Sequence, residues 1–411
     1  MTAPEQSTVF FNPLEPGYME NPYPHLAELR EQDPVHHSLI ERWVLFGYDD
    51  VFELLRNPSL SVDERNVDLS QSERAAQFDA AFEEAGTEAE PSHAILNLDP
   101  PDHTRLRRLV SKAFTPRTIN DLRSMIEEMV SGILDRMEAD GGGDVVAELA
   151  FPLPFDVITR MLGMPEGDTA QICAWSEAIV KTLDPIISEE EIAEAVVASR
   201  SFDAHIEEVI AWKRANPADD LLTLMIDAEE DGDRMSAIEL RDQVGLLFVA
   251  GHETTVNLIG TGIYELIQHP DQMQLWLDDP SIAQNAVDEL LRYVSPVQFS
   301  RRISTADVTF GDKTIDRGRF IMAALASANR DPAKWGPTAD ELDLTRGGAG
   351  QHVSFGSGSH YCLGASLAKL EAEVAIGQFI TRFPEARIVD SSWNGRINLR
   401  GLATLNVEVD A

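Results

Sequence analysis

The chain has 411 residues, 43% of them hydrophobic, which is typical of a globular protein with a large buried core and excludes a disordered or fibrous one. Seventy acidic residues against 33 basic ones leave a net charge of -37, so the chain repels phosphate backbones and anionic lipid surfaces. We therefore expect neither nucleic acid nor a membrane among its partners.

No feature of the chain indicates a targeting segment or a domain boundary. Residues 1–6 are polar and lack the charged-then-apolar layout of a signal peptide, and the longest apolar runs are far too short to span a membrane. No stretch rich in proline, glycine and serine divides the chain, and no internal repeat stands out. We expect a cytoplasmic protein with one domain over residues 1–411, without a membrane anchor or a fused reductase.

The predicted elements are mostly helices, because apolar residues recur at three- and four-residue spacing along much of the chain. The helical segments are residues 104–113, 117–139, 190–214, 236–269, 283–292 and 363–383. Strands are predicted at residues 35–46, 302–310, 314–325 and 397–409, the middle two joined at Gly311-Asp312. We interpret Gly141-Gly142-Gly143 as a turn after a helix. The fold class is mainly α, with small marginal β-sheets.

The segment 236–269 is the longest predicted helix. Ser236 and Glu239 form a capping-box pattern, Pro270 ends the segment, and at about 1.5 Å per residue it is roughly 50 Å long. In its middle, residues 251–255 (Gly-His-Glu-Thr-Thr) interrupt the apolar run. Such an interruption marks a local bulge at a functional site, or two shorter helices with Thr254 or Thr255 as a cap. The sequence alone leaves both open.

The chain has two cysteines, too few for a disulfide framework or a multi-cysteine metal site. Cys362 follows a glycine-containing loop and precedes an amphipathic helix, and a helix start stabilises a thiolate through its free N–H groups and dipole. A structural cysteine does not need such a loop. We therefore expect Cys362 to carry chemistry and Cys173 to be a packing residue.

The loop resembles a known family. Phe355, Gly358, Cys362 and Gly364 match the F-x-x-G-x-x-x-C-x-G pattern of the cytochrome P-450 heme loop. The resemblance implies a soluble heme-thiolate monooxygenase in which Cys362 is the axial ligand of heme b (iron protoporphyrin IX) and Phe355 packs beside the sulfur. In that family the thiolate pushes electron density to the iron, so that bound dioxygen is cleaved.

The resemblance also implies four ligands for the heme propionates. The segment Asp99–Arg108 is similar to the start of the family's propionate-binding helix, where His103 and Arg107, four residues apart, share one face. Arg302 and His360 are the other two by resemblance. For Arg105 and Arg108 a solvated basic face remains the alternative.

Glu289-Leu290-Leu291-Arg292 resembles the family's buried E-x-x-R pair. Seen alone, this pattern is a surface ion pair worth a few tenths of a kcal/mol. Its place 70 residues before Cys362 favours the buried pair. We expect Arg330, in preference to Arg346, to be its third member.

The resemblance makes residues 250–254 an oxygen-activation groove. Reduction of bound dioxygen needs two protons, so a hydroxyl and an acid linked to solvent are required. Thr254 is predicted as the hydroxyl and Glu253 as the acid. One oxygen atom would enter a C–H or C=C bond of a lipophilic small molecule, and the other would leave as water. Expected substrate contacts are Leu96, Ala250, Val297 and Phe299.

Three rival functions remain open. A peroxygenase of this family would use peroxide directly, but such relatives lack the acid and hydroxyl pair. Cys362 could be the nucleophile of an enzyme without heme, with His360 as its base; colour separates the two, since only a heme protein is red. A heme carrier or sensor would leave Glu253 and Thr254 unexplained.

Electrons are expected from a separate ferredoxin with its reductase, because the heme fold uses the whole chain and leaves no flavin or nicotinamide domain. Arg105, Arg108 and Lys112 recur at spacings of three and four and form a basic stripe beside the propionate face. An acidic donor could be steered there. The alternative is that these residues only offset neighbouring acids.

Overall fold

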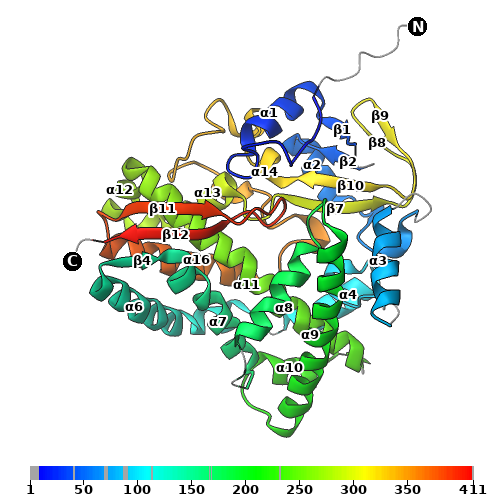
Figure 1. The fold of residues 1–411 in the computed structure, drawn as a ribbon, viewed down its shortest axis with the longest axis horizontal. Helices are drawn as coiled ribbons and strands as arrows, with labels where there is room; N and C mark the ends of the chain where they lie inside the picture. The colour runs from blue at the N-terminus through cyan, green and yellow to red at the C-terminus, as the bar shows by residue number, and fades with distance from the viewer. Residues whose placement is uncertain are drawn as a thin grey trace. The chain divides into compact units, whose positions relative to one another are not determined.

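The computed structural model describes residues 9–39, 42–68, 73–86, 91–112, 114–165, 167, 169–230 and 233–409 (Figure 1). Residues 1–6, whose composition argued against a signal peptide, lie outside this part. The chain forms two compact units: the first comprises Met1–Asp68 and Asp279–Cys362, and the second Leu69–Asp278 and Leu363–Ala411. The expectation of one domain over residues 1–411 stays a prediction.

The first unit contains a five-stranded sheet in the order β1-β2-β10-β7-β3. Its strands are β1 (Val35–His37), β2 (Trp43–Leu45), β3 (Leu60–Ser61), β7 (Phe299–Ser304) and β10 (Phe320–Ala324). Only the β2–β10 pair is parallel. The predicted strand 302–310 therefore contains two strands, because β7 pairs with β10 while β8 (Val308–Phe310) pairs with β9 (Lys313–Ile315) across Gly311.

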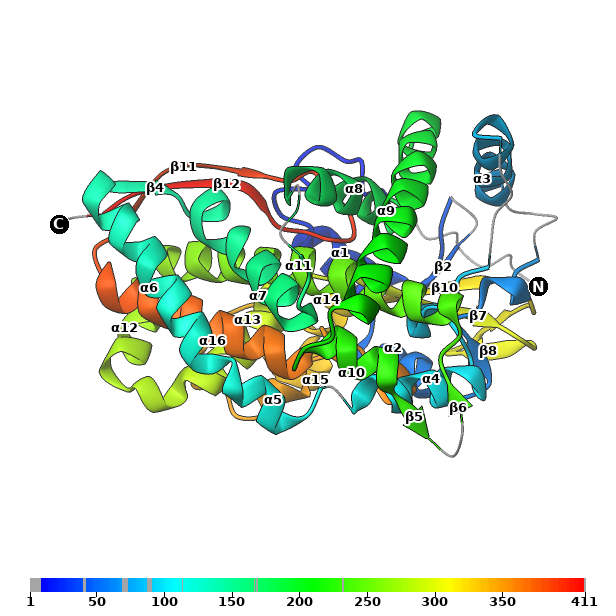
Figure 2. The same ribbon diagram turned by 90° about the horizontal axis from the view of Figure 1, so that it is seen from below.

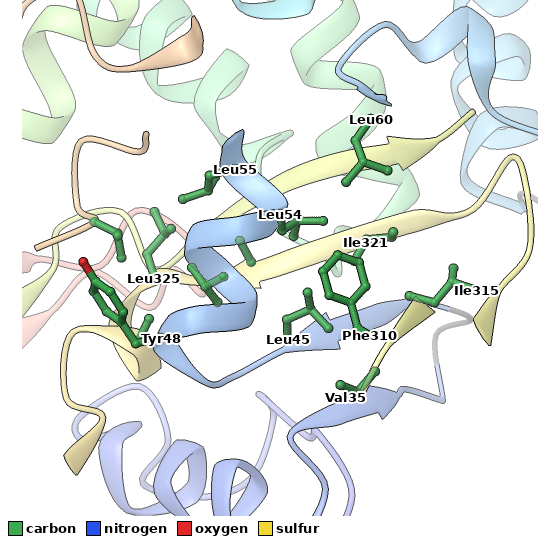
Figure 3. Close-up of a cluster of buried hydrophobic side chains, with 14 of the residues drawn as sticks. Val35, Leu45, Tyr48, Leu54, Leu55, Leu60, Phe310, Ile315, Ile321 and Leu325 are labelled. Carbon is green, nitrogen blue, oxygen red and sulfur yellow. The ribbon is translucent and has the colours of Figure 1, made fainter. Parts of the chain in front are cut away.

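The helices of the first unit are short. They are α1 (Tyr23–Gln32), α2 (Tyr48–Arg56), α13 (Ala283–Val294), α14 (Leu325–Ala328) and α15 (Pro332–Trp335), with single 3-10 turns at Glu64–Asn66, Pro280–Ile282, Ala349–Gln351 and Gly358–His360. Apolar residues of α2 recur at three- and four-residue spacing, and Leu54 and Leu55 join Leu45 and Ile321 of the sheet in one buried cluster (Figure 3). This cluster packs α2 against β2 and β10 of the sheet.

The second unit is mostly helical (Figures 1 and 2). Its helices are α3 (Glu73–Glu84), α4 (Asp102–Ser111), α5 (Pro116–Asp121), α6 (Arg123–Asp140), α7 (Pro152–Leu162), α8 (Thr169–Lys181), α9 (Glu189–Ala215), α10 (Leu221–Asp227), α11 (Ala237–Gln268), α12 (Pro270–Asp278) and α16 (Ala365–Arg382), with a 3-10 turn at Ile95–Asn97 and a π-turn at Val146–Ala150. Helix α11 packs against α7, α9 and α16.

A three-stranded sheet in the order β11-β12-β4 completes the second unit, together with a two-stranded ribbon of β5 (Glu229–Glu230) and β6 (Asp233–Arg234). The strands of the three-stranded sheet are β11 (Arg387–Trp393), β12 (Leu402–Glu408) and β4 (Gly142–Asp144). The interpretation of Gly141–Gly143 as a turn is thus wrong beyond Gly141, which ends α6 in the left-handed conformation. A Cβ on Gly142 would lie 2.0 Å from the carbonyl oxygen of Val407, so only glycine allows this pairing.

Helix α11 is continuous from Ala237 to Gln268, which excludes the alternative of two shorter helices. Ser236 and Glu239 form the predicted capping box. The hydroxyls of Thr254 and Thr255 cap no helix; they donate to the carbonyls of Ala250 and Gly251, at 2.9 and 3.2 Å. Within the described residues, no helix is both long and apolar enough to cross a membrane.

Candidate functional site

The loop before Cys362 takes its shape from two glycines. Gly356 and Gly358 have φ values of 70° and 73°, in the left-handed region that favours glycine. The N–H of Cys362 donates to the carbonyl of Phe355 at 2.9 Å and closes the loop. The Cys362 thiol is exposed and makes no disulfide bond. The loop therefore presents a thiol on a backbone held by its own hydrogen bonds.

The end of α2 brings Arg302 to this loop. A Cβ on Gly358 would lie 3.0 Å from the carbonyl oxygen of Leu55, so the loop passes closely over the last turn of α2. The same carbonyl accepts a hydrogen bond from Nη2 of Arg302 at 3.1 Å. Arg302 is 4% exposed on β7, and His360 lies in the 3-10 turn that begins at Gly358. Within the first unit, Arg302 and the start of the 3-10 turn that carries His360 therefore both lie beside the last turn of α2.

The E-x-x-R pair is buried, not superficial. Glu289 and Arg292 have no exposed surface, and they form a two-pronged ion pair with N–O distances of 2.7 and 2.8 Å. Arg292 also donates to the carbonyls of Asn329, Ala339 and Glu341 at 2.7 to 2.9 Å. These bonds tie the segment 329–341 to α13 and compensate the burial of the charges.

Arg346 completes this network, so the preference for Arg330 was wrong. Nε of Arg346 donates to Oε1 of Glu289 at 3.1 Å. The guanidinium of Arg330 lies instead between the rings of Tyr23 and Tyr293, at 3.5 and 3.8 Å, and donates to the carbonyl of Tyr293. The two aromatic faces hold Arg330 away from the carboxylate.

Asn329 connects the network to the cysteine loop. Its side-chain oxygen accepts from the N–H of Val353 at 2.8 Å, and its side-chain nitrogen donates to the hydroxyl of Ser354 at 2.7 Å. That hydroxyl donates to the carbonyl of Leu291 on α13 at 2.7 Å. The buried Glu289–Arg292 pair is therefore connected, through the hydrogen bonds of Asn329 and Ser354, to the loop that carries Cys362.

In the second unit, α4 places His103 and Arg107 together as predicted. His103 is 2% exposed, and its burial lowers the pKa of the imidazole. The positive charge of Arg107 lowers this pKa further, while Asp99 opposes the effect. A bound carboxylate would accept hydrogen bonds from both side chains and would oppose the effect of Arg107 on this pKa.

Glu253, on α11, is connected electrostatically to an ion pair nearer the solvent. Burial raises the pKa of Glu253, the guanidinium of Arg396 lowers it, and the carboxylate of Glu177 raises it. Arg396 and Glu177 lie 3.4 Å apart, and the side chain of Glu177 is 60% exposed. The predicted acid is thus partly buried and lies near an ion pair whose Glu177 end reaches solvent, and Thr254 is the next residue of α11.

Sequence reasoning missed Glu177 and Arg396, and it gave no role to His252, although His252 lies in the polar segment 251–255. His252 is fully buried, lies 3.1 Å from the carbonyl of Phe151 through Nε2, and has its pKa lowered to about 4 by burial. It therefore stays neutral and anchors α11 to the π-turn before α7. Glu177 and Arg396 lie far from Glu253 in sequence, and no local pattern marks them.

The four expected substrate contacts are divided between the two units. Leu96 is 49% exposed and Ala250 is exposed on α11, both in the second unit; in the first unit Val297 is half-buried and Phe299 is 4% exposed, with its ring packed on Phe11. Phe299 is therefore a core side chain of its unit.

The basic stripe on α4 is incomplete as a docking surface. Arg105 makes ion pairs with Glu239 and with Asp233, the latter at 3.4 Å, so it offsets neighbouring acids. Arg108 and Lys112 are exposed.

Cys173 behaves as a packing residue: burial, followed by the charges of Glu253 and Glu177, raises its pKa to about 12.

The cytochrome P-450 family model matches residues 66–275 and 280–386 of this chain. The chain belongs to the cytochrome P-450 family. Cytochrome P-450 107B1 of Saccharopolyspora erythraea is 38% identical over 407 residues, which are 97% of each chain. Vitamin D(3) 25-hydroxylase of Pseudonocardia autotrophica is 41% identical over 373 residues, covering 90% of this chain and 88% of that protein.

Solved structures agree with this assignment. The bacillaene polyketide synthase cytochrome P-450 PksS of Bacillus subtilis superposes with a TM-score of 0.86 at 36% identity, covering 98% of this chain and all of that one. The resemblance seen in the cysteine loop, and the mainly helical P-450 fold it implied, are both confirmed. The protein is a P-450 monooxygenase, an oxidoreductase of the bacterial type with heme b as its cofactor.

The residues described above fit heme b. An exposed thiol follows a glycine loop in the first unit, and the last turn of α2, which this loop approaches, also binds the guanidinium of Arg302. In the second unit, α4 holds His103 and Arg107 close enough for the charge of Arg107 to lower the pKa of His103. A thiolate ligand for iron and cationic donors for propionate carboxylates are the chemistry that this cofactor requires.

Proposed function

We propose that Cys362 is the thiolate ligand of the heme iron and that the propionates bind Arg302 and His360 in the first unit and His103 and Arg107 in the second. The observation that carries this proposal is the cysteine loop, closed by the Cys362 to Phe355 hydrogen bond and supported by the buried Glu289–Arg292–Arg346 network. When bound, the heme supplies the iron at which dioxygen is reduced and the substrate is oxidised.

Glu253 and Thr254 move protons in this proposal. Burial raises the pKa of Glu253, which favours the protonated acid that a proton donor must be. The Thr254 hydroxyl gives its hydrogen to the Ala250 carbonyl, so its oxygen is left to accept a hydrogen bond from a water or a bound ligand. Thr254 thus positions the water or ligand that carries the proton. Glu253 supplies a new proton to it, which Glu253 receives from the side of Arg396 and Glu177.

The substrate is a lipophilic small molecule in this proposal, with Leu96, Ala250 and Val297 among its contacts. Two relatives support the substrate class by their names, one a vitamin D(3) 25-hydroxylase and the other a polyketide biosynthesis P-450. The reaction inserts one oxygen atom of dioxygen into the substrate. Bacterial P-450 monooxygenases draw electrons from redox partners, and we propose a ferredoxin with its reductase for this chain.

The decisive test of this function replaces the proposed iron ligand. In Cys362→His, the reduced carbon monoxide complex is expected to lose the red-shifted absorption band of a thiolate ligand, because imidazole donates less electron density to the iron. Cys173→Ser is the matched control and should keep the band. A thiolate-type band that persists in Cys362→His would show that another group binds the iron.

A further inference from the structure

The segment that precedes α4 is bound to α11 by two adjacent side chains. Gln243 is 1% exposed, and its side-chain amide accepts from the N–H of Ile95 at 3.0 Å and donates to the carbonyl of His93 at 2.6 Å. The carboxylate of Asp242 accepts from the N–H of His93 at 2.7 Å. Three main-chain groups of a loop are therefore satisfied by side chains of one helix turn, as a neighbouring strand would satisfy them.

Asp242 is itself held in place. Its Oδ1 accepts from Nε of Arg241 at 2.9 Å, which leaves Oδ2 for His93. Arg241 also lies 3.3 Å from Glu207 on α9. The loop is thus connected through α11 to a second helix, and its position depends on charges as well as on the Gln243 amide.

With the backbone held in this position, the side chains of residues 95–98 differ in their exposure to solvent. Ile95 and Leu98 are buried in a cluster with Leu106 of α4, packed against Leu246 of α11. Leu96, between them, is 49% exposed. The N–H of Ile95 is bound and its side chain is buried, so the backbone next to Leu96 is held while the Leu96 side chain stays exposed.

We propose that Gln243 and Asp242 are positioning residues that fix the segment 93–97 on α11, so that Leu96 decides which substrates the enzyme accepts. This inference rests on the proposed function, which makes Leu96 a substrate contact. Glutamine suits the position because an amide both donates and accepts, and because asparagine, one carbon shorter, would not span both groups. Loss of the amide frees the segment and removes the selectivity of Leu96.

The first part of the test measures backbone protection. In the heme-loaded enzyme, hydrogen exchange of a peptide covering residues 92–98 should be at least about tenfold faster in Gln243→Leu than in the parent, because local opening no longer breaks buried hydrogen bonds. Gln243→Glu keeps an acceptor for Ile95 and loses the donor to His93, so its exchange should be intermediate. Gln268→Leu, at the exposed end of α11, is the matched control. Unchanged exchange in Gln243→Leu would overturn the positioning role.

The second part measures selectivity with two iron-binding probes, imidazole and 4-phenylimidazole, which differ by one phenyl ring. The ratio of their dissociation constants should change about fivefold or more in Gln243→Leu and in Leu96→Ala, and the double variant should add nothing, since both act through one surface. A purely structural role would lower the melting temperature and leave this ratio unchanged. If Gln243→Leu does not fold, Gln243→Glu carries the same comparison.

The outcomes separate this inference from the proposed function. If imidazole produces no iron-ligation spectrum in the parent, the heme assignment fails, and the selectivity role of Leu96 fails with it. If both probes bind the iron and the ratio is the same in parent, Gln243→Leu and Leu96→Ala, the proposed function stands and the inference is wrong. Additive changes in the double variant would also overturn it, because Gln243 would then act independently of Leu96.

Discussion

Thr254 is the residue on which the proposed proton path depends. Its hydroxyl hydrogen is engaged by Ala250 at 2.9 Å, which leaves the oxygen as an acceptor. In Thr254→Ala we expect normal heme and substrate binding, with reducing equivalents diverted into peroxide. Product per electron should fall by roughly tenfold or more, in keeping with the loss of one positioned proton-transfer group.

Two variants control this experiment. Thr254→Ser keeps the hydroxyl and should keep most of the product yield. Thr255→Ala removes a buried hydroxyl that donates to Gly251, and it should leave the coupling of electrons to product unchanged. Peroxide and product are measured against electrons consumed. Equal yields in Thr254→Ala and the parent would show that Thr255 or a water carries the proton instead.

Glu371, on α16, makes a separate prediction about stability. The residue is 2% exposed, and burial raises its pKa from an ordinary 4.5 to about 8. Between these pH values the folded protein keeps a proton that the unfolded chain releases, so the free energy of unfolding falls as pH rises through this range. Glu371→Gln has no carboxyl group at this position, so its free energy of unfolding does not show this decrease with pH. Relative to the parent it should therefore gain about 3 kcal/mol between pH 5 and pH 8, as an upper value.

Denaturant unfolding at several pH values measures this difference, with Glu385→Gln, an exposed carboxylate, as the control. The control should follow the parent at every pH. Stability curves of Glu371→Gln and the parent that run parallel from pH 5 to pH 8 would show that the carboxyl of Glu371 is ionised in the folded protein.

At the scale of elements, the buried network joins α13 to the chain that leads to Cys362. Arg346 donates to Glu289 and to the carbonyls of Thr338 and Glu341, at 2.8 to 3.1 Å. Removing the Arg346 guanidinium leaves these buried acceptors without the hydrogen bonds that it donates. We expect Arg346→Leu to lower the free energy of unfolding by about 3 to 5 kcal/mol and to reduce heme retention.

The comparison with Arg330 makes this prediction specific. Arg330→Leu loses contacts with two tyrosine rings and one carbonyl, and should cost about 1 to 2 kcal/mol. Arg387→Gln, in an exposed pair with Glu408, should cost nothing measurable. The order of the three variants is read from denaturant unfolding and heme content. An equal cost for Arg346→Leu and Arg330→Leu would contradict a special role of Arg346.

Several elements were predictable because their signals are local. The capping box of Ser236 and Glu239 and the apolar period after it gave α11, and Gly311-Asp312 marked the β8–β9 turn. The predicted helix 117–139 is two helices, α5 and α6, which meet at Leu122. Strand β4 was missed, because its two glycines, Gly142 and Gly143, carry no alternating pattern and pair only where β12 approaches them.

The charge of the whole molecule bears on its electron donor. A net charge of -37 repels an acidic ferredoxin, so docking requires a local basic surface. Arg105 makes ion pairs with Glu239 and Asp233, whereas Arg108 on α4 and Lys112, which follows this helix, are exposed cations. If the donor is the proposed ferredoxin, reversing both to Glu should slow its first electron transfer by about tenfold at low salt, and added salt should shrink the difference.

Stopped-flow reduction measures this rate, with heme content and probe affinity unchanged. Arg117→Glu with Arg136→Glu, on α5 and α6, makes the same change in net charge at another exposed place and is the matched control. Equal slowing by both pairs would show an effect of net charge alone. An unchanged rate in the Arg108 and Lys112 variant would place the donor elsewhere.

By itself the sequence determined the family, the long central helix and the cysteine loop. Each depends on what a short stretch of backbone requires: glycines at Gly356 and Gly358 for positive φ, a capping box for α11, and a four-residue spacing for His103 and Arg107. The residues that meet each of these requirements are close together in the sequence, so a sequence pattern can reveal them.

Only the tertiary structure decided which distant groups meet. Arg346 and not Arg330 reaches Glu289, because Tyr23 and Tyr293 hold the guanidinium of Arg330 between them. Gln243 pairs with the backbone of a segment about 150 residues earlier in the chain. The physical reason is that a buried charge or amide takes whichever partner the packing brings within hydrogen-bonding distance, and such partners are separated by chain lengths that no sequence period encodes.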